Sequence, residues 1–181
     1  NLFTEVGVHR NPSIAMYAID SLKQLSMKFL EKIELSNFNF QSVFLIPFEA
    51  IMSKSPRLEI KELVLRVIDN ITQARAENIM SGWRAIFGVY ALAGSDNHGS
   101  LNNLAFVAVD RIYINHWNVA KESFVDLVKC LAAFAKNKMF TKTALLSIAR
   151  IRDVADRHVE ETLINAKKVR GKVVFTDAKK D

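Results

Sequence analysis

Cysteine, proline and glycine are scarce in this chain, which has one Cys, three Pro and six Gly among 181 residues. The single cysteine, Cys130, cannot form an internal disulfide bond, and no CxxC or His/Cys cluster has the spacing of a structural zinc site. A many-stranded fold needs a turn about every 8–12 residues, which so few Gly and Pro do not supply. These shortages exclude a disulfide-rich miniprotein, disfavour a β-sandwich or barrel, and favour long helices and a reducing compartment.

Long hydrophobic runs are also missing. The densest apolar run, from Val43 to Phe48, is far shorter than the ~18 residues that a membrane span requires, and it contains Pro47. The chain begins with Asn1 rather than Met, and no basic stretch followed by an apolar core and a small-residue cleavage site is visible. We therefore expect no membrane span and no signal peptide, and we expect the sequence to be a piece of a longer protein.

The composition is that of a globular protein, with 50% hydrophobic and 24% charged residues. The formal net charge is +6, and its distribution is uneven. Residues 1–120 carry 11 basic and 11 acidic side chains, so residues 121–181 carry the whole excess. A basic end suits nucleic acid, an anionic membrane or an acidic protein partner, but it is equally consistent with a solvated surface that binds nothing.

Apolar residues recur at steps of three and four in four segments, which predicts four amphipathic helices. Asn11-Pro12 and Ser55-Pro56 provide an N-cap followed by proline, and residues 96–99 form a polar turn before the third segment. The four stripes are Ile14/Ala18/Leu22/Leu25/Phe29, Ile60/Val64/Val67/Ile71, Leu101/Leu104/Ala105/Ala108/Ile112 and Ala144/Ile148/Ile151/Ala155.

Three further helices are expected between these four, over residues 37–53, 81–93 and 121–136. Each has an aromatic-aliphatic stripe, namely Phe44/Phe48/Ile51, Trp83/Phe87/Tyr90 and Phe124/Val128/Leu131. Aligning Ile19, Ile68, Val109 and Ile151 gives intervals of 49, 41 and 42 residues. A period near 40–47 residues is typical of HEAT and armadillo repeats, whose helix pairs bury their apolar faces only by stacking. We therefore predict an all-α, HEAT/armadillo-like α-solenoid of about seven helices over residues 1–165.

Acidic residues recur at one position of the first three aligned helices. Asp20, Asp69 and Asp110, with Arg66 and Arg111 nearby, either form a polar ladder between neighbouring helices or are three solvated carboxylates. In both cases we expect them to be architectural rather than catalytic.

Residues 166–181 lose the helical period and become rich in lysine. We predict a basic tail there, which is either disordered or continues into a further element.

No recognisable catalytic motif or phosphate-binding glycine loop is present. We interpret Asp96-Asn97-His98 as a turn, and Asp156, His158 and Glu160 as solvated charges, because neither group has the arrangement of a metal site or triad. We expect Cys130 and Trp83 to belong to the core, since both keep helical spacing with aliphatic residues. No catalytic residue, metal or cofactor is predicted.

One long motif extends through much of the chain, strongest over residues 13–31, 38–49 and 78–84 and weaker at 105–106 and 130–137. Its positions are Asp20, Ser21, Gln24, Leu25, Ser26, Phe29, Phe38, Phe40, Pro47, Phe48, Glu49, Asn78, Ser81, Gly82 and Trp83. These stretches resemble the large Arf guanine-nucleotide exchange factors of the BIG or Sec-seven type, and the resemblance reaches to about residue 155. It implies the first homology region downstream of the catalytic exchange domain, with no catalytic residue of its own.

That resemblance also implies a regulatory segment on trans-Golgi or endosomal membranes, with an Arf GTPase, including its GTP-bound form, and other regions of the same exchange factor as partners. The basic C-terminal third then suggests an anionic membrane or partner surface, for which the candidates are Lys129, Lys136, Lys138, Lys142, Arg150 and Arg152. The alternative is a protein scaffold without lipid or Arf contact. Nucleic-acid binding is disfavoured because no reader motif accompanies the basic residues.

Overall fold

The computed structural model describes residues 2–32 and 39–177, and the side chains as far as Lys168. These residues form α-helices and two short 3₁₀ turns, Ala76–Asn78 and Lys121–Ser123, with no strand among them. The helices are α1 (Leu2–Gly7), α2 (Pro12–Phe29), α3 (Phe40–Lys54), α4 (Leu58–Arg75), α5 (Trp83–Ser95), α6 (Gly99–Asn115), α7 (Trp117–Ala120), α8 (Phe124–Ala135) and α9 (Thr141–Asp177).

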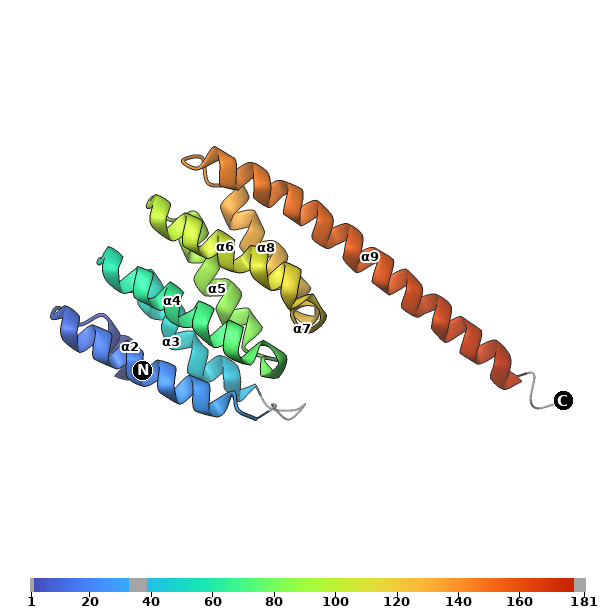
Figure 1. The fold of residues 1–181 in the computed structure, drawn as a ribbon, viewed down its shortest axis with the longest axis horizontal. Helices are drawn as coiled ribbons and strands as arrows, with labels where there is room; N and C mark the ends of the chain where they lie inside the picture. The colour runs from blue at the N-terminus through green and yellow to red at the C-terminus, as the bar shows by residue number, and fades with distance from the viewer. Residues whose placement is uncertain (1, 33–38, 178–181) are drawn as a thin grey trace.

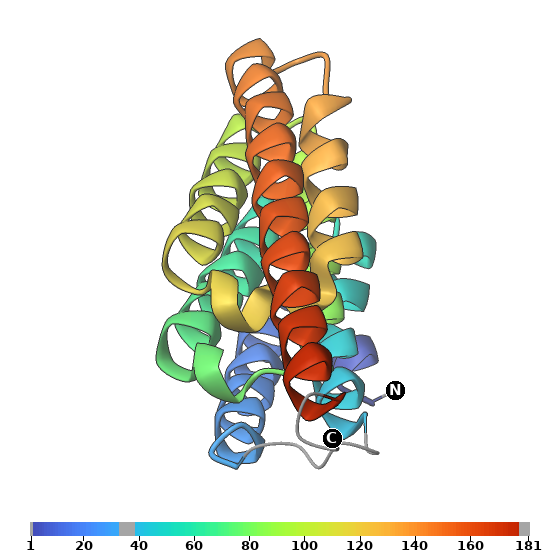
Figure 2. The same cartoon turned by 90° about the vertical axis from the view of Figure 1, so that its right-hand side faces the viewer.

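The helices stack in two layers, as Figures 1 and 2 show. One layer, the A layer, is the row α2, α4, α6 and α9, in which each helix contacts the next. The other, the B layer, is the row α1, α3, α5 and α8. This arrangement confirms the predicted all-α solenoid. The sequence analysis missed α1, which is a B-layer helix, and α7, which follows α6 directly.

A continuous core fills the space between the layers. The B-layer helices contribute its largest side chains, and Phe48, Trp83, Phe87, Tyr90 and Phe134 are each at most 1% exposed. The A-layer helices contribute aliphatic residues such as Ile19, Ile68 and Val109, all fully buried. Each helix pair therefore covers the apolar face of its neighbour, which is the physical reason for the repeat.

The first predicted helix start is confirmed, and the second is not. Asn11 caps α2, and its side-chain oxygen accepts a 2.9 Å hydrogen bond from the Ser13 N–H. Ser55 instead closes α3, because its N–H donates to the Ile51 carbonyl at 2.9 Å. Its hydroxyl accepts weakly from Arg57 N–H, and α4 begins only at Leu58. A serine before proline can serve either helix, and here the preceding one uses it.

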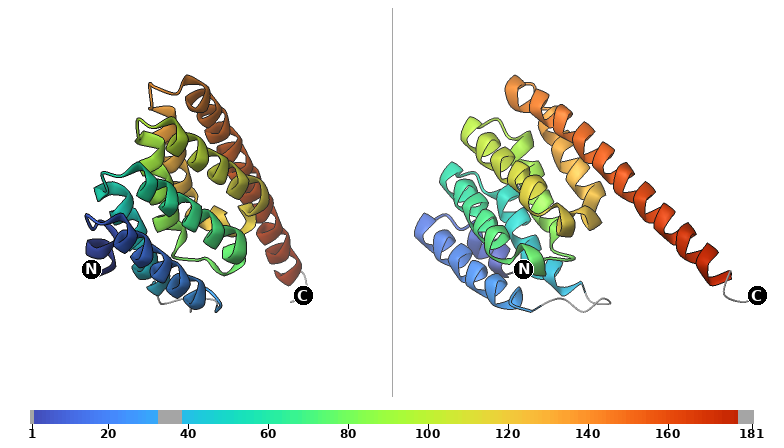
Figure 3. Two further views of the ribbon diagram at one scale, coloured as in Figure 1. Left: turned by 60° about the vertical axis from the view of Figure 1, so that its left-hand side comes forward. Right: turned by 45° about the vertical axis from the view of Figure 1, so that its right-hand side comes forward.

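The last helix differs from the sequence prediction in two ways. α9 continues through residues 166–177, where the sequence analysis expected the helical period to be lost, and that stretch contains no proline that would end the helix. Residues 178–181 lie outside the described part of the chain. Ile148, predicted to be on the buried stripe, is 55% exposed, whereas Ser147 and Val154 are fully buried. The right-hand view of Figure 3 shows that α9 extends past the rest of the stack.

Candidate functional site

The predicted polar ladder joins two of the three pairs of neighbouring A-layer helices, α4 with α6 and α6 with α9. Arg111 of α6 donates to both carboxylate oxygens of Asp69 on α4, at 2.8 and 2.9 Å. Arg150 of α9 donates to Asp110 of α6 at 2.7 Å. Asp20 instead accepts from Gln24 on its own helix at 2.7 Å. Charge-assisted bonds at partly exposed sites fix the register of the stacked helices more than they stabilise them.

The structure places two arginines differently from what the sequence suggested. Arg66 is exposed and takes no part in these bonds, which use Arg111 and Arg150 instead. Arg150, a candidate for membrane or partner binding, is occupied by Asp110 and Asp153, and its guanidinium lies 4.5 Å from the centre of the Tyr113 ring. The sequence analysis named Arg66 and Arg111 as nearby arginines without pairing them, whereas stacking pairs Asp69 and Asp110 each with an arginine about 40 residues later in the chain.

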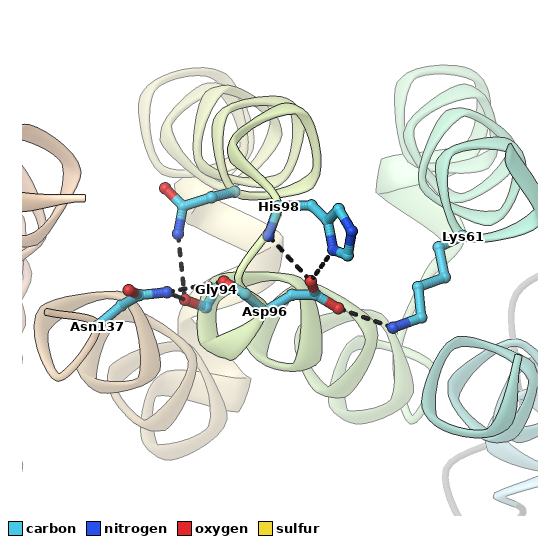
Figure 4. Close-up of polar contacts among 6 residues, drawn as sticks. Lys61, Gly94, Asp96, His98 and Asn137 are labelled. Atoms are coloured by element: carbon cyan, nitrogen blue, oxygen red, sulfur yellow. Dashed lines mark hydrogen bonds and ion pairs between the residues drawn. The ribbon is translucent and has the colours of Figure 1, made fainter. Parts of the chain in front are cut away.

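A second polar network ties three repeats together at the α5–α6 turn (Figure 4). Asp96 accepts hydrogen bonds from Lys61 of α4 at 2.7 Å and from the backbone N–H of His98 at 3.0 Å, and its carboxylate also lies 2.7 Å from His98 Nδ1. Burial alone would raise the pKa of the Asp96 carboxyl, but the hydrogen bonds from Lys61 and His98 outweigh it and lower the pKa to about 2.

Two asparagines complete this network from either side. Asn137, after α8, donates to the carbonyls of Gly94 and Asp96 at 2.8 and 2.9 Å. Asn102 of α6 is buried and donates to the same Gly94 carbonyl at 3.1 Å. The Asp96-Asn97-His98 segment is thus the turn that the sequence predicted, and its polar side chains satisfy backbone groups at the helix ends.

Gln41, at the start of α3, and the family-motif residue Asn78 build a similar junction. The buried Gln41 side chain donates to the Asn78 carbonyl at 2.8 Å and accepts from the Met80 N–H at 2.8 Å. Asn78 donates in turn to the Leu30 carbonyl at 2.8 Å. These bonds join the end of α2, the start of α3 and the connection between α4 and α5, so the motif positions here serve the packing of repeats.

Most other motif residues also have structural roles. Phe48, Gly82 and Trp83 are buried, as are Pro47 and Ser26, whose hydroxyl bonds the Leu22 carbonyl. Phe29 stacks on Phe44 with ring centres 3.9 Å apart, and Phe40 meets both rings edge-on. Ser21 bonds the Tyr17 carbonyl, Leu25 and Ser81 are half-buried, and Glu49 lies at the surface described next. Phe38 lies outside the described residues.

A groove over α5 was missed by the sequence analysis. It has a volume of about 530 Å³ and runs between α3 and α8. Its lining includes Ile46, Glu49, Arg84, Gly88, Asp126 and Lys129. Glu49 lies against Gly88, and burial raises the pKa of its carboxyl while Arg84 opposes that shift. The sequence feature that could have indicated this groove is the small residue Gly88, one helical turn after Arg84.

Five of the six basic candidates are exposed to solvent. Lys136, Lys138 and Lys142 surround the turn between α8 and α9, where Met139 is 66% exposed. Lys129 is on the α5 groove, and Arg152 lies on α9 with its side chain 84% exposed. The structure therefore places three lysines and one large apolar side chain together at one tip.

The described residues contain no group of three or more His, Cys, Asp or Glu side chains able to hold a metal ion. Cys130 is fully buried, and burial raises the pKa of its thiol far above the ordinary value. Within the described ranges, no helix has both the length and the apolar character needed to cross a bilayer. The polar clusters here are therefore helix junctions, with side chains bonded to each other and to backbone groups.

Comparison with known proteins identifies a family for this stack of helices. Residues 28–111 match the family model described as Mon2/Sec7/BIG1-like, HDS. The chain is 45% identical over 157 residues to Brefeldin A-inhibited guanine nucleotide-exchange protein 1 of Homo sapiens, which covers 84% of this chain and 8% of that protein.

Two plant relatives extend the match. Brefeldin A-inhibited guanine nucleotide-exchange protein 2 of Arabidopsis thaliana is 39% identical to this chain over 165 residues, which cover 89% of this chain and 9% of that protein. Brefeldin A-inhibited guanine nucleotide-exchange protein 4 of Arabidopsis thaliana is 34% identical over 178 residues, which cover 96% of this chain and 10% of that protein. The chain thus spans about a tenth of the length of these relatives. It belongs to the BIG-type guanine nucleotide-exchange protein family, as a segment that carries the HDS region.

Proposed function

We propose that this segment is a non-catalytic regulatory part of an Arf guanine-nucleotide exchange factor, which helps recruit the enzyme to trans-Golgi or endosomal membranes and controls Arf activation in vesicle trafficking. The observation that carries the proposal is the match to BIG-type exchange proteins along most of the chain. The polar side chains of Gln41 and Asn137 are engaged in helix junctions, which suits a docking scaffold rather than a reaction centre.

The membrane part of the proposal rests on the tip between α8 and α9. Lys136, Lys138 and Lys142 are exposed there around Met139. Each basic residue close to an anionic membrane contributes on the order of 1 kcal/mol, and an exposed methionine can enter the interface between them. No acidic side chain occurs between residues 127 and 152 to oppose this attraction.

Vesicle sedimentation tests the membrane contact. The chain should pellet with vesicles containing phosphatidylserine and remain in solution with neutral phosphatidylcholine vesicles. The triple variant Lys136→Glu, Lys138→Glu, Lys142→Glu should lose most of that binding, whereas Lys28→Glu, Lys32→Glu, Arg66→Glu makes the same charge change elsewhere and should lose much less. Equal pelleting of the two triple variants would contradict a lipid-binding tip.

A pull-down tests the Arf contact. The segment should retain GTP-loaded Arf more strongly than GDP-loaded Arf if it senses the product of the exchange reaction. Equal retention of both forms would contradict a feedback role while leaving the membrane contact standing.

The groove over α5 favours a second candidate function, a protein scaffold within the exchange factor that touches neither lipid nor Arf. Glu49, Arg84, Asp126 and Lys129 give this groove no excess of charge, so it suits a protein segment better than an anionic lipid. Binding there should resist salt, in contrast to binding at the lysine tip.

A further inference from the structure

α9 carries a second apolar stripe that no described residue covers. Leu145, Ile148, Val159 and Leu163 are 62%, 55%, 55% and 56% exposed. Arg152 lies on the same line, four residues after Ile148 and seven before Val159. A row of large apolar side chains along one helix marks an interaction surface more often than a solvated one.

The stripe faces away from the rest of the A layer. Arg150 and Glu161 point toward the preceding helices, since Arg150 bonds Asp110 and Glu161 accepts from Trp117 at 2.7 Å. Ile148 and Val159 each precede one of these residues by two, which places them about 160° around the helix. Ile148 and Val159 thus lie on the side of α9 that is turned away from Asp110 and Trp117.

The solvent face of α9 is separate from the stripe and has a different composition. Lys142 and Glu160 share that face, about 60° around the helix from Leu145 and Leu163, and are exposed, whereas Asp156 lies beside Arg152 at the edge of the stripe. A helix whose only free side met water would carry charges there and no second apolar row. α9 therefore has the pattern of an A-layer helix with neighbours on both sides, of which the structure contains one.

The polar ladder indicates which kind of side chain a helix next to α9 would place opposite it. Asp69 and Asp110 each accept from an arginine of the next A-layer helix. The alignment of Ile68, Val109 and Ile151 puts Arg152 at the equivalent position of α9. Arg152 is bound only loosely, 3.8 Å from Asp156 on its own helix. The ladder thus ends on an exposed cation whose ion pair lies within its own helix, with the sign of the earlier steps reversed.

A neighbouring aromatic contact agrees with this equivalence. Phe106 of α6 aligns with Ile148 of α9, and Phe106 packs edge-on against Phe134 of α8, with ring centres 5.7 Å apart. The position held by Ile148 is thus one that an earlier A-layer helix uses to contact the next B-layer helix.

We propose that this face of α9 binds one more helix of the same polypeptide, which lies alongside α9, covers Leu145, Ile148 and Val159, and places a carboxylate opposite Arg152. The relatives, of which this chain spans 8 to 10%, are long enough to supply it. The site is distinct from the lysine tip and does not depend on the proposed membrane contact. It differs from a lipid surface because it offers a single cation with an acid beside it.

Cysteine labelling tests the docking face. Ile148→Cys and Val159→Cys would be made in the whole polypeptide that carries this segment and in the 181-residue chain, and maleimide labelling would be followed by mass spectrometry of the α9 peptide. Labelling should be at least ten-fold slower in the whole polypeptide. Ala149→Cys, on the solvent face, should react equally in both, and the buried Cys130 should stay unlabelled as a folding control.

Charge reversal tests the ladder. In the whole polypeptide, Arg152→Glu should speed the labelling of Ile148→Cys several-fold, whereas Arg66→Glu, the same change at an exposed position of α4, should leave it unchanged. Equal labelling in the two proteins would overturn the proposal. So would protection that depends on the concentration of the 181-residue chain, which would indicate a second copy, or protection that requires added phosphatidylserine vesicles, which would indicate lipid.

Discussion

At the scale of single residues, the Asp96 carboxylate makes a pH-dependent contribution to stability. Its pKa is about 2 in the folded chain, below the ordinary value near 3.9 of an unfolded aspartate. The unfolded chain therefore binds the proton first as the pH falls, so the stabilisation is complete above about pH 4 and is lost between about pH 4 and pH 2.

This contribution is expected to be about 1–2 kcal/mol in the free energy of unfolding. Urea denaturation from pH 6 to pH 2 should show a gap between the wild type and Asp96→Asn that closes across that window. A gap of constant size would contradict the assignment to Asp96.

Asn137 shows how a single amide can hold a junction. Its NH₂ group donates to two backbone carbonyls, and its oxygen accepts from the Met139 N–H at 2.9 Å. Asn137→Asp keeps the shape and the acceptor but removes the donor, leaving two carbonyls facing a carboxylate. The free energy of unfolding should fall by about 2–3 kcal/mol. The same change at the exposed Asn97 is the control and should cost less than about 0.5 kcal/mol.

At the scale of elements, two glycines of α5 predict opposite responses to the same substitution. A Cβ at Gly88 would lie 2.7 Å from the Glu49 carboxylate, which is the free end of a flexible side chain beside a groove. A Cβ at Gly94 would lie 2.8–2.9 Å from the Phe134 ring, which is fully buried. The first neighbour can move aside, and the second cannot.

Gly88→Ala should therefore leave stability unchanged or raise it by up to about 1 kcal/mol, through better helix propensity. Gly94→Ala should lower it by about 1–3 kcal/mol, through overpacking. Thermal or urea denaturation of the two variants measures the difference. Equal losses would mean that Glu49 is held against Gly88 as firmly as Phe134 is against Gly94.

The elements themselves follow from sequence to different degrees. The 3.6-residue periodicity was sufficient to predict the seven principal helices, because each buries an apolar stripe. The short α7 was missed because four residues are too few to show a period. α9 has two stripes, and periodicity cannot say which one is buried, so Ile148 was assigned to the core while Val154 occupies it.

At the scale of the whole molecule, a stack of repeats has contacts only between neighbours, so its two ends respond to truncation locally. The side chains of residues 162–168 on α9 are all exposed. A chain ending at Lys168 should therefore melt within about 2 °C of the full one.

A chain ending at Phe140 is the matched comparison. It lacks α9, uncovers α8 and removes Arg150 from Asp110. Its melting temperature should fall by roughly 10 °C or more, as expected for the loss of an apolar interface. Calorimetry of both truncations measures this, and a large loss on ending at Lys168 would show that the distal part of α9 contributes to the stack.

The sequence by itself determined the class of fold, the repeat of about forty residues and the family, because apolar spacing and a long motif are properties of the chain in one dimension. It also determined where the positive charge is concentrated. Only the tertiary structure decided which arginine meets which aspartate, that Arg150 bonds the preceding A-layer helix while Arg152 does not, and which stripe of α9 is buried. Those outcomes depend on the register of helices that are forty residues apart in the chain, and register is set by packing in three dimensions.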